Sequence, residues 1–103
     1  MATYVSLLKF TPQGVEKFQA TADRAAAFKN EAKKLGLKVT ANYWTLGAFD
    51  GLLIFEAPDD ETATAAMLTL SSHGSVATQT SRAFGATEIK QIIAKLPAVK
   101  GAT

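Results

Sequence analysis

Residues 43–60 read YWTLGAFDGLLIFEAPDD, a pattern typical of a strand, a short connection, a second strand and the start of a helix. Residues 46–49 form the expected connection, and Pro58 ends the second strand. Residues 52–55 are all apolar, so both faces of that strand should be covered. Residues 59–61, Asp-Asp-Glu, favour a helix start because unpaired backbone N–H groups attract negative charge.

The chain before this stretch predicts a strand and a helix. Residues 3–10 are β-rich, and Thr11 is placed to cap a helix with Pro12 at its first position. From Val15 to Leu35 apolar residues recur at steps of three and four, which predicts one amphipathic helix. Gly36 is expected to end it in a left-handed conformation.

A strand is predicted over residues 37–45, where polar and apolar side chains alternate. One face would carry Leu37, Val39, Ala41 and Tyr43, and the other Lys38, Thr40, Asn42 and Trp44. The helix that starts at residues 59–61 should end near residues 72–74, before a fourth strand over residues 76–84. A third helix should follow, with one apolar face made of Ile89, Ile92, Ile93 and Leu96.

The order β-α-β-β-α-β with an extra C-terminal helix predicts an α+β, ferredoxin-like sandwich. Residues 1–96 should form one domain with a four-stranded antiparallel sheet, and residues 97–103 a flexible tail. Helices on one side leave the other sheet face open, and an open apolar face indicates an interface. We therefore expect a homodimer or an assembly of dimers, paired as a dimeric α/β barrel.

The open face is expected to carry alternate residues of the third strand and members of a mainly polar set: Thr40, Asn42, Trp44, Thr78, Thr80 and Arg82. Which alternate set points inward on each strand stays open at this point. A cavity lined by threonines, Trp44 and Arg82 is expected between the two sheets of the dimer.

Composition excludes several classes of protein. The net charge is only +2 and the basic residues are scattered, so neither nucleic acid nor a membrane surface is expected as a partner. Cysteine is absent and His73 is the only histidine, so no metal site and no cofactor are predicted. No segment is long and apolar enough to span a bilayer and no signal peptide is evident, which favours a cytoplasmic location.

Residues 44–50, 55–61 and 74–84 resemble the GYD-domain family of small bacterial and archaeal proteins. The resemblance covers most of residues 3–96 and implies no established function. It places the family's glycine at Gly47 and its aspartate at Asp50, while its tyrosine is replaced by Phe49. At the level of fold, the family resembles the dimeric α/β-barrel superfamily, which includes cofactor-free quinol monooxygenases and muconolactone isomerases; fold alone does not carry function across such a group.

Asp50 and His73 are the candidate catalytic residues. Asp50 is a candidate general base or ligand-orienting group, and the alternative is that its carboxylate accepts backbone hydrogen bonds at the hairpin. His73 is expected at a helix end, where solvation is the simpler interpretation and proton transfer the alternative.

Trp44, Phe49, Asp50 and Arg82 are the candidate ligand-binding residues. Trp44 and Arg82 would hold a small apolar or aromatic anion by stacking and by a bidentate contact. The alternative for Arg82 is a salt bridge at a subunit interface.

Three functions remain open from the sequence. The first is an oligomeric small-molecule-binding module with a cavity between subunits. The second is a cofactor-independent monooxygenase or isomerase acting on a small aromatic or enolic compound, and the third is a structural oligomerisation domain. Whether the chain is an enzyme is left undecided.

Overall fold

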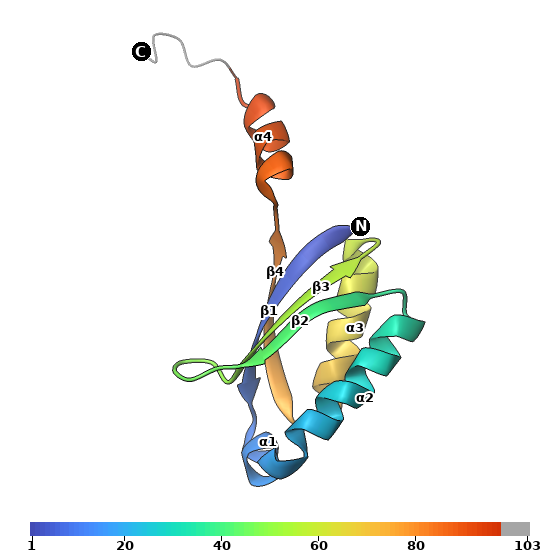
Figure 1. The fold of residues 1–103 in the computed structure, drawn as a ribbon, viewed down its shortest axis with the longest axis vertical. Helices are drawn as coiled ribbons and strands as arrows, with labels where there is room; N and C mark the ends of the chain where they lie inside the picture. The colour runs from blue at the N-terminus through green and yellow to red at the C-terminus, as the bar shows by residue number, and fades with distance from the viewer. Residues whose placement is uncertain (98–103) are drawn as a thin grey trace.

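One four-stranded antiparallel sheet, covered by helices on one face, forms the centre of the molecule (Figure 1). The structure is a computed structural model that describes residues 1–97. The strands are β1 (Ala2–Phe10), β2 (Lys38–Trp44), β3 (Gly51–Ala57) and β4 (Val76–Ala83), in the spatial order β2-β3-β1-β4. The helices are α1 (Pro12–Glu16), the 3₁₀ helix η1 (Phe18–Ala20), α2 (Thr21–Lys34), α3 (Asp60–Ser72) and α4 (Ala86–Ala94). This is the predicted α+β ferredoxin-like arrangement.

The core lies between the sheet and the helices α2 and α3. Alternate residues of the two central strands point to the helices, and the Phe55 side chain is 0% exposed. Its ring stacks on Tyr4 at a centroid distance of 5.3 Å. The other residues of β3, among them Leu52 and Ile54, face the open side and are only half-buried. The expectation that β3 sends two apolar side chains to the open face is therefore confirmed.

The helix predicted over residues 15–35 is interrupted at Lys17, whose φ of −112° and ψ of 29° are not helical. Thr11 caps α1 by accepting from the Gly14 N–H at 3.1 Å, with Pro12 at the first position as predicted. Thr11 also anchors this turn to the start of β4, since its own N–H donates to the Ser75 carbonyl at 3.1 Å. The axis must then change direction for α2 to lie over the sheet, so the predicted continuous stripe is wrong.

Apolar residues near the break at Lys17 are also more exposed than the predicted helix implied. Val15 and Phe18, which the stripe placed on the buried face, are 59% and 57% exposed. Within α2, Phe28 and Ala32 do reach the core. Gly36 has φ +89°, the left-handed conformation expected at the end of the helix.

A β-bulge in β2 overturns the predicted alternation of that strand. Val39 pairs with Phe55 on the helix side, whereas Ala41 pairs with Ile54 on the open side, and Thr40 is the extra residue between them. Past the bulge the two faces are exchanged relative to the sequence pattern. The side chains of Asn42 and Trp44 consequently face the helices.

The open face therefore does not carry the mainly polar residues that the sequence analysis placed there. On β4, Thr78, Thr80 and Arg82 pair with Leu8, Ser6 and Tyr4 and share their helix-side face. The open face instead carries the opposite alternate residues of each strand, including Val5, Leu7, Leu52, Ile54, Tyr43, Gln79 and Ser81. The expected lining of an inter-sheet cavity by Trp44 and Arg82 is wrong for this reason.

Helix α4 extends away from the sheet and its covering helices (Figure 1). None of its residues is buried. Ile89, Ile92, Ile93 and, just beyond the helix, Leu96 are all exposed. The predicted tail over residues 97–103 lies outside the described residues except for Pro97. Within residues 1–97, no helix has the length and apolar character that crossing a membrane requires.

Candidate functional site

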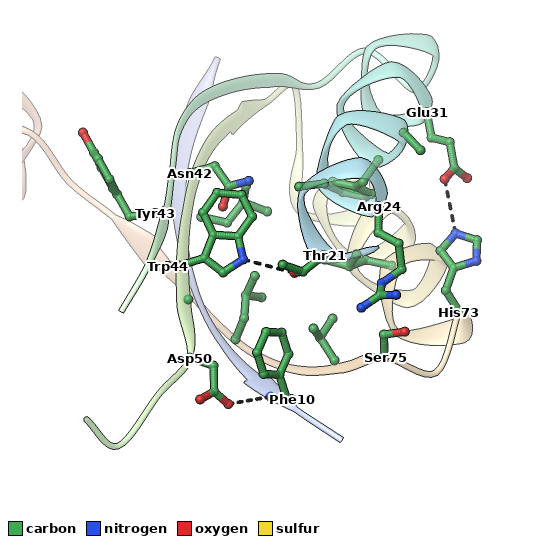
Figure 2. Close-up of a pocket in the computed structure, with 18 residues that line it drawn as sticks. Phe10, Thr21, Arg24, Glu31, Asn42, Tyr43, Trp44, Asp50, His73 and Ser75 are labelled. Atoms are coloured by element: carbon green, nitrogen blue, oxygen red, sulfur yellow. Dashed lines mark hydrogen bonds and ion pairs between the residues drawn. The ribbon is translucent and has the colours of Figure 1, made fainter. Parts of the chain in front are cut away.

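An apolar pocket of about 290 Å³ lies between α2 and the helix-facing side of the sheet (Figure 2). Its walls include Leu8, Phe28 and Leu53 from β1, α2 and β3. Polar side chains from several other elements border these walls. A concave, mostly apolar site with a few polar groups is the usual form of a small-molecule site.

Trp44 lines this pocket because the bulge turns the end of β2 toward the helices. Its indole Nε1–H donates to the Thr21 hydroxyl at 3.0 Å, which ties the end of β2 to the start of α2. Figure 2 shows the ring standing beside the pocket, with the Nε1–Thr21 bond marked. The bond holds one aromatic surface in a defined place at the pocket wall.

Asp50 lies at the edge of the pocket and bonds to β1 in two ways. Its carboxylate Oδ2 accepts from the Phe10 N–H at 2.7 Å, and its own N–H donates to the Leu8 carbonyl at 2.8 Å. Asp50 thus accepts a backbone hydrogen bond, as one interpretation of the sequence held, but the donor lies on β1 rather than in the hairpin turn. The same carboxylate also borders the pocket.

His73 follows the last residue of α3 and also lines the pocket. Its Nε2 lies 3.2 Å from Oε1 of Glu31 on α2. This contact joins the ends of two helices at the pocket rim (Figure 2). The fold therefore brings His73 to the same pocket as Trp44 and Asp50, although His73 lies more than 20 residues further along the chain.

Arg82 lies elsewhere, on the edge strand opposite to that of Trp44. Its Nη2 is 2.9 Å from Oε2 of Glu88, its Nη1 donates to the carbonyls of Thr3 and Ala83, and its guanidinium lies over the Phe84 ring at 4.7 Å. The bond from Arg82 also holds the pKa of the Glu88 carboxyl below its usual value. One chain therefore does not bring Arg82 and Trp44 around a common ligand.

Phe49 does not line the pocket. It belongs to the β2–β3 connection, where its carbonyl accepts from the Thr45 hydroxyl at 2.7 Å. Of the four predicted ligand-binding residues, the structure gathers Trp44 and Asp50 and leaves Phe49 and Arg82 outside.

A second, more polar groove lies between α3 and β4. There the Tyr4 hydroxyl donates to Oδ1 of Asp60. This hydrogen bond, followed by burial, raises the pKa of Tyr4 to about 12. Within residues 1–97, no group of three or more His, Asp or Glu side chains is arranged to hold a metal ion.

Sequence reasoning missed Arg24 and Thr21, which line the pocket from the first turn of α2. The expected single helix over residues 15–35 gave no reason to treat residue 21 as a helix start. A signal was nevertheless present, because a single arginine stands directly before three alanines, residues 25–27, in the predicted helix. The position of Arg24 in the first turn of α2 becomes visible only with the break at Lys17.

Comparison with known proteins places the chain in a family. The profile of the GYD domain matches residues 4–93. A relative from Thermus thermophilus, named glutamine synthetase and cystathionine beta-lyase binding protein, is 34% identical over 97 residues, covering 93% of this chain and 99% of the relative.

Two solved structures share the fold. The dehydrochlorinase TftG from Burkholderia phenoliruptrix AC1100, in complex with 2,5-dihydroxybenzoquinone, superposes with a TM-score of 0.60 at 18% identity, over 82% of this chain and 96% of that one. TTHA0845 from Thermus thermophilus superposes with a TM-score of 0.55 at 22% identity, over 84% and 96%. The profile match over residues 4–93 and the relative with 34% identity show that the chain belongs to the GYD domain family.

Proposed function

We propose that this protein is a small-molecule-binding module whose site is the pocket between α2 and the sheet. The observation that carries the proposal is an open, mostly apolar pocket of about 290 Å³, which no side chain of residues 1–97 fills. Contiguous apolar surface is rarely left exposed by a soluble protein, and an apolar groove of this kind marks a binding site for a ligand or partner. A ligand would supply the missing contacts.

The polar groups around the pocket support the same proposal. Asp50, His73 and Asn42 border an otherwise apolar surface, an arrangement that orients a bound molecule. On the same fold, TftG was solved with 2,5-dihydroxybenzoquinone, a ring of suitable size for a probe. The proposed site lies within one chain, whereas the sequence analysis predicted a cavity between subunits.

The test uses Trp44, which is the only tryptophan and lines the pocket. Binding of benzamide, a neutral single-ring probe, should change the tryptophan fluorescence saturably. Ala25→Leu should abolish the change because Ala25 lines the pocket and a larger side chain would fill it. Ala26→Leu is the matched control, since Ala26 is exposed on the same helix. Equal binding by both variants, or no saturable change in the wild type, would overturn the proposal.

We further infer that the open sheet face forms a homodimer interface. Val5, Leu7, Leu52 and Ile54 form a half-buried apolar strip there with no helix over it. A second copy of the same face would cover this strip, as in the dimeric α/β-barrel arrangement that the family resembles.

The oligomeric state tests this inference. Sedimentation equilibrium should give a dimer for the wild type and a monomer for Ile54→Lys, because a charge at a self-complementary interface is buried twice. Leu68→Lys is the control, since Leu68 is 66% exposed on the helix side of the molecule. A monomeric wild type, or dimers of Ile54→Lys, would contradict the inference.

A second candidate function is the binding of a metabolic enzyme. It is favoured by the Thermus relative named for binding glutamine synthetase and cystathionine beta-lyase, which aligns over 93% of this chain. Biolayer interferometry with those two enzymes from the same source organism would test it. Saturable binding to either enzyme would support this function, and binding to neither would contradict it.

A further inference from the structure

The guanidinium of Arg24 is an unpaired charge beside the pocket. Arg24 stands in the first turn of α2, is half-buried and lines the pocket. Its Nη2 is shielded from water and has no hydrogen-bond partner, the one side-chain atom of residues 1–97 in this condition. Buried N–H groups of charged side chains are nearly always paired, so an acceptor is missing here.

The acidic side chains around the pocket are engaged with other partners. Glu31 contacts His73 at 3.2 Å, and Asp50 accepts from the Phe10 N–H. The salt bridges found within residues 1–97 are His73–Glu31 and Arg82–Glu88, and neither includes Arg24. Among the described residues, 1–97, no carboxylate therefore forms a salt bridge with this guanidinium.

The place of Arg24 on α2 adds to the positive potential. The first turn of a helix is the positive end of its dipole, so arginine there is unfavourable unless an anion lies nearby. The N-cap residue Ala20 makes no side-chain cap hydrogen bond, and Asp23 is the one acidic residue in this first turn. Figure 2 shows the guanidinium pointing from α2 toward Ser75, on a different side of the pocket from Asp50.

The size and walls of the pocket restrict the molecule that brings the anion. A cavity of about 150 Å³ accommodates benzene. The pocket volume of about 290 Å³ is about twice as large, so it has room for one ring with its substituents. Trp44, held by Thr21, offers a flat surface for such a ring.

We propose that the ligand of this pocket is a small planar carboxylate, a single ring whose acidic group pairs with Arg24 while the ring lies against Trp44. This inference rests on the proposed function of the pocket and names its ligand class. Asp50 and Asn42, on the far side from Arg24, favour a hydroxyl on the ring over a second acidic group, because a second anion would face the Asp50 carboxylate. Hydroxybenzoates have this chemistry.

The test compares benzoate and 4-hydroxybenzoate with the neutral isostere benzamide by isothermal titration calorimetry on the full chain. The carboxylates should bind roughly ten- to a hundredfold more tightly than benzamide, the usual difference for a hydrogen bond to a charged group. Arg24→Met should remove this difference, so that the carboxylates and benzamide bind the variant equally. Arg82→Met is the control and should keep the difference, because Arg82 does not line the pocket.

Failure of this inference and failure of the proposed function give different results. If benzamide and the carboxylates bind equally to the wild type, the anion assignment is overturned and the pocket remains a binding site. If none of the probes binds, both are overturned. Should Arg24→Met not fold, Arg24→Lys decides: it keeps the charge but loses the bidentate contact, so the carboxylate preference should fall severalfold. An unchanged preference in Arg24→Lys would contradict the bidentate pairing.

Discussion

The substitution Gly14→Ala tests how α1 is attached to the start of β4. A Cβ added at Gly14 would lie 2.0 Å from the Ser75 carbonyl oxygen, whereas ordinary contacts begin near 3.4 Å. The helix or the Ser75 carbonyl must therefore move by about 1.4 Å. That carbonyl also accepts the Thr11 N–H, so the movement strains this bond as well.

The expected cost follows from these contacts. Forced backbone movement costs about 1–3 kcal/mol, and a weakened hydrogen bond about 1 kcal/mol. The higher helix propensity of alanine offsets up to about 1 kcal/mol of this destabilisation. The free energy of unfolding of Gly14→Ala should therefore fall by about 1–4 kcal/mol, and Tm by about 4–8 °C for each kcal/mol in a domain of this size.

Urea and thermal unfolding followed by circular dichroism would measure this change. Gly85→Ala is the matched control, because a Cβ at Gly85 meets nothing within 4 Å and its φ is −76°. Without a clash, Gly14→Ala would instead stabilise the folded protein by about 0.4–1 kcal/mol, because alanine lowers the conformational entropy of the unfolded chain. The two expectations have opposite signs, so a Gly14→Ala protein as stable as the wild type would refute the close approach.

Three further outcomes are expected. Because the pKa of Tyr4 is raised from 10.0 to about 12 in the folded protein, its contribution to stability is complete below pH 10 and is lost as pH rises toward 12. Tyr4→Phe should therefore reduce the fall in Tm between pH 10 and pH 12, and Tyr43→Phe should leave that fall in place. Phe55→Ala should lower the free energy of unfolding by about 3–5 kcal/mol in urea titrations, whereas Phe18→Ala, at an exposed position, should change it by less than about 0.5 kcal/mol. Hydrogen bonds from Thr62 lower the pKa of Asp59, so the stability that Asp59 contributes is present at neutral pH and is lost as pH falls below 3.8. Asp59→Ala should reduce the loss of Tm at acid pH. An unchanged loss would contradict the capping role of Asp59.

Much of the fold could be predicted because its signals are local. The apolar run at residues 52–55 identified the central strand β3, and Asp59 identified the start of α3, where its carboxylate accepts from the Thr62 N–H at 2.7 Å. Gly36 marked the end of α2. Each signal depends on the conformational preferences of a few neighbouring residues, and the order of elements then limits the topology.

The site could be predicted only in part. Trp44, Asp50 and His73 were singled out from their residue types and their places at turns and ends of elements. Arg82 belonged to the same prediction, yet it lies at the opposite sheet edge from Trp44. Residue type indicates what a side chain is able to do, but strand order determines which side chains meet.

The sequence by itself determined the element order, the fold class and the family resemblance. Only the tertiary structure decided which face each side chain occupies. The bulge at Thr40 turns Trp44 toward the helices, and the break at Lys17 aims Arg24 into the pocket. The bulge depends on the pairing of β2 with β3, and the break depends on the anchoring of α1 on the start of β4. Contacts of this kind leave no periodic signal in the residues that they reorient.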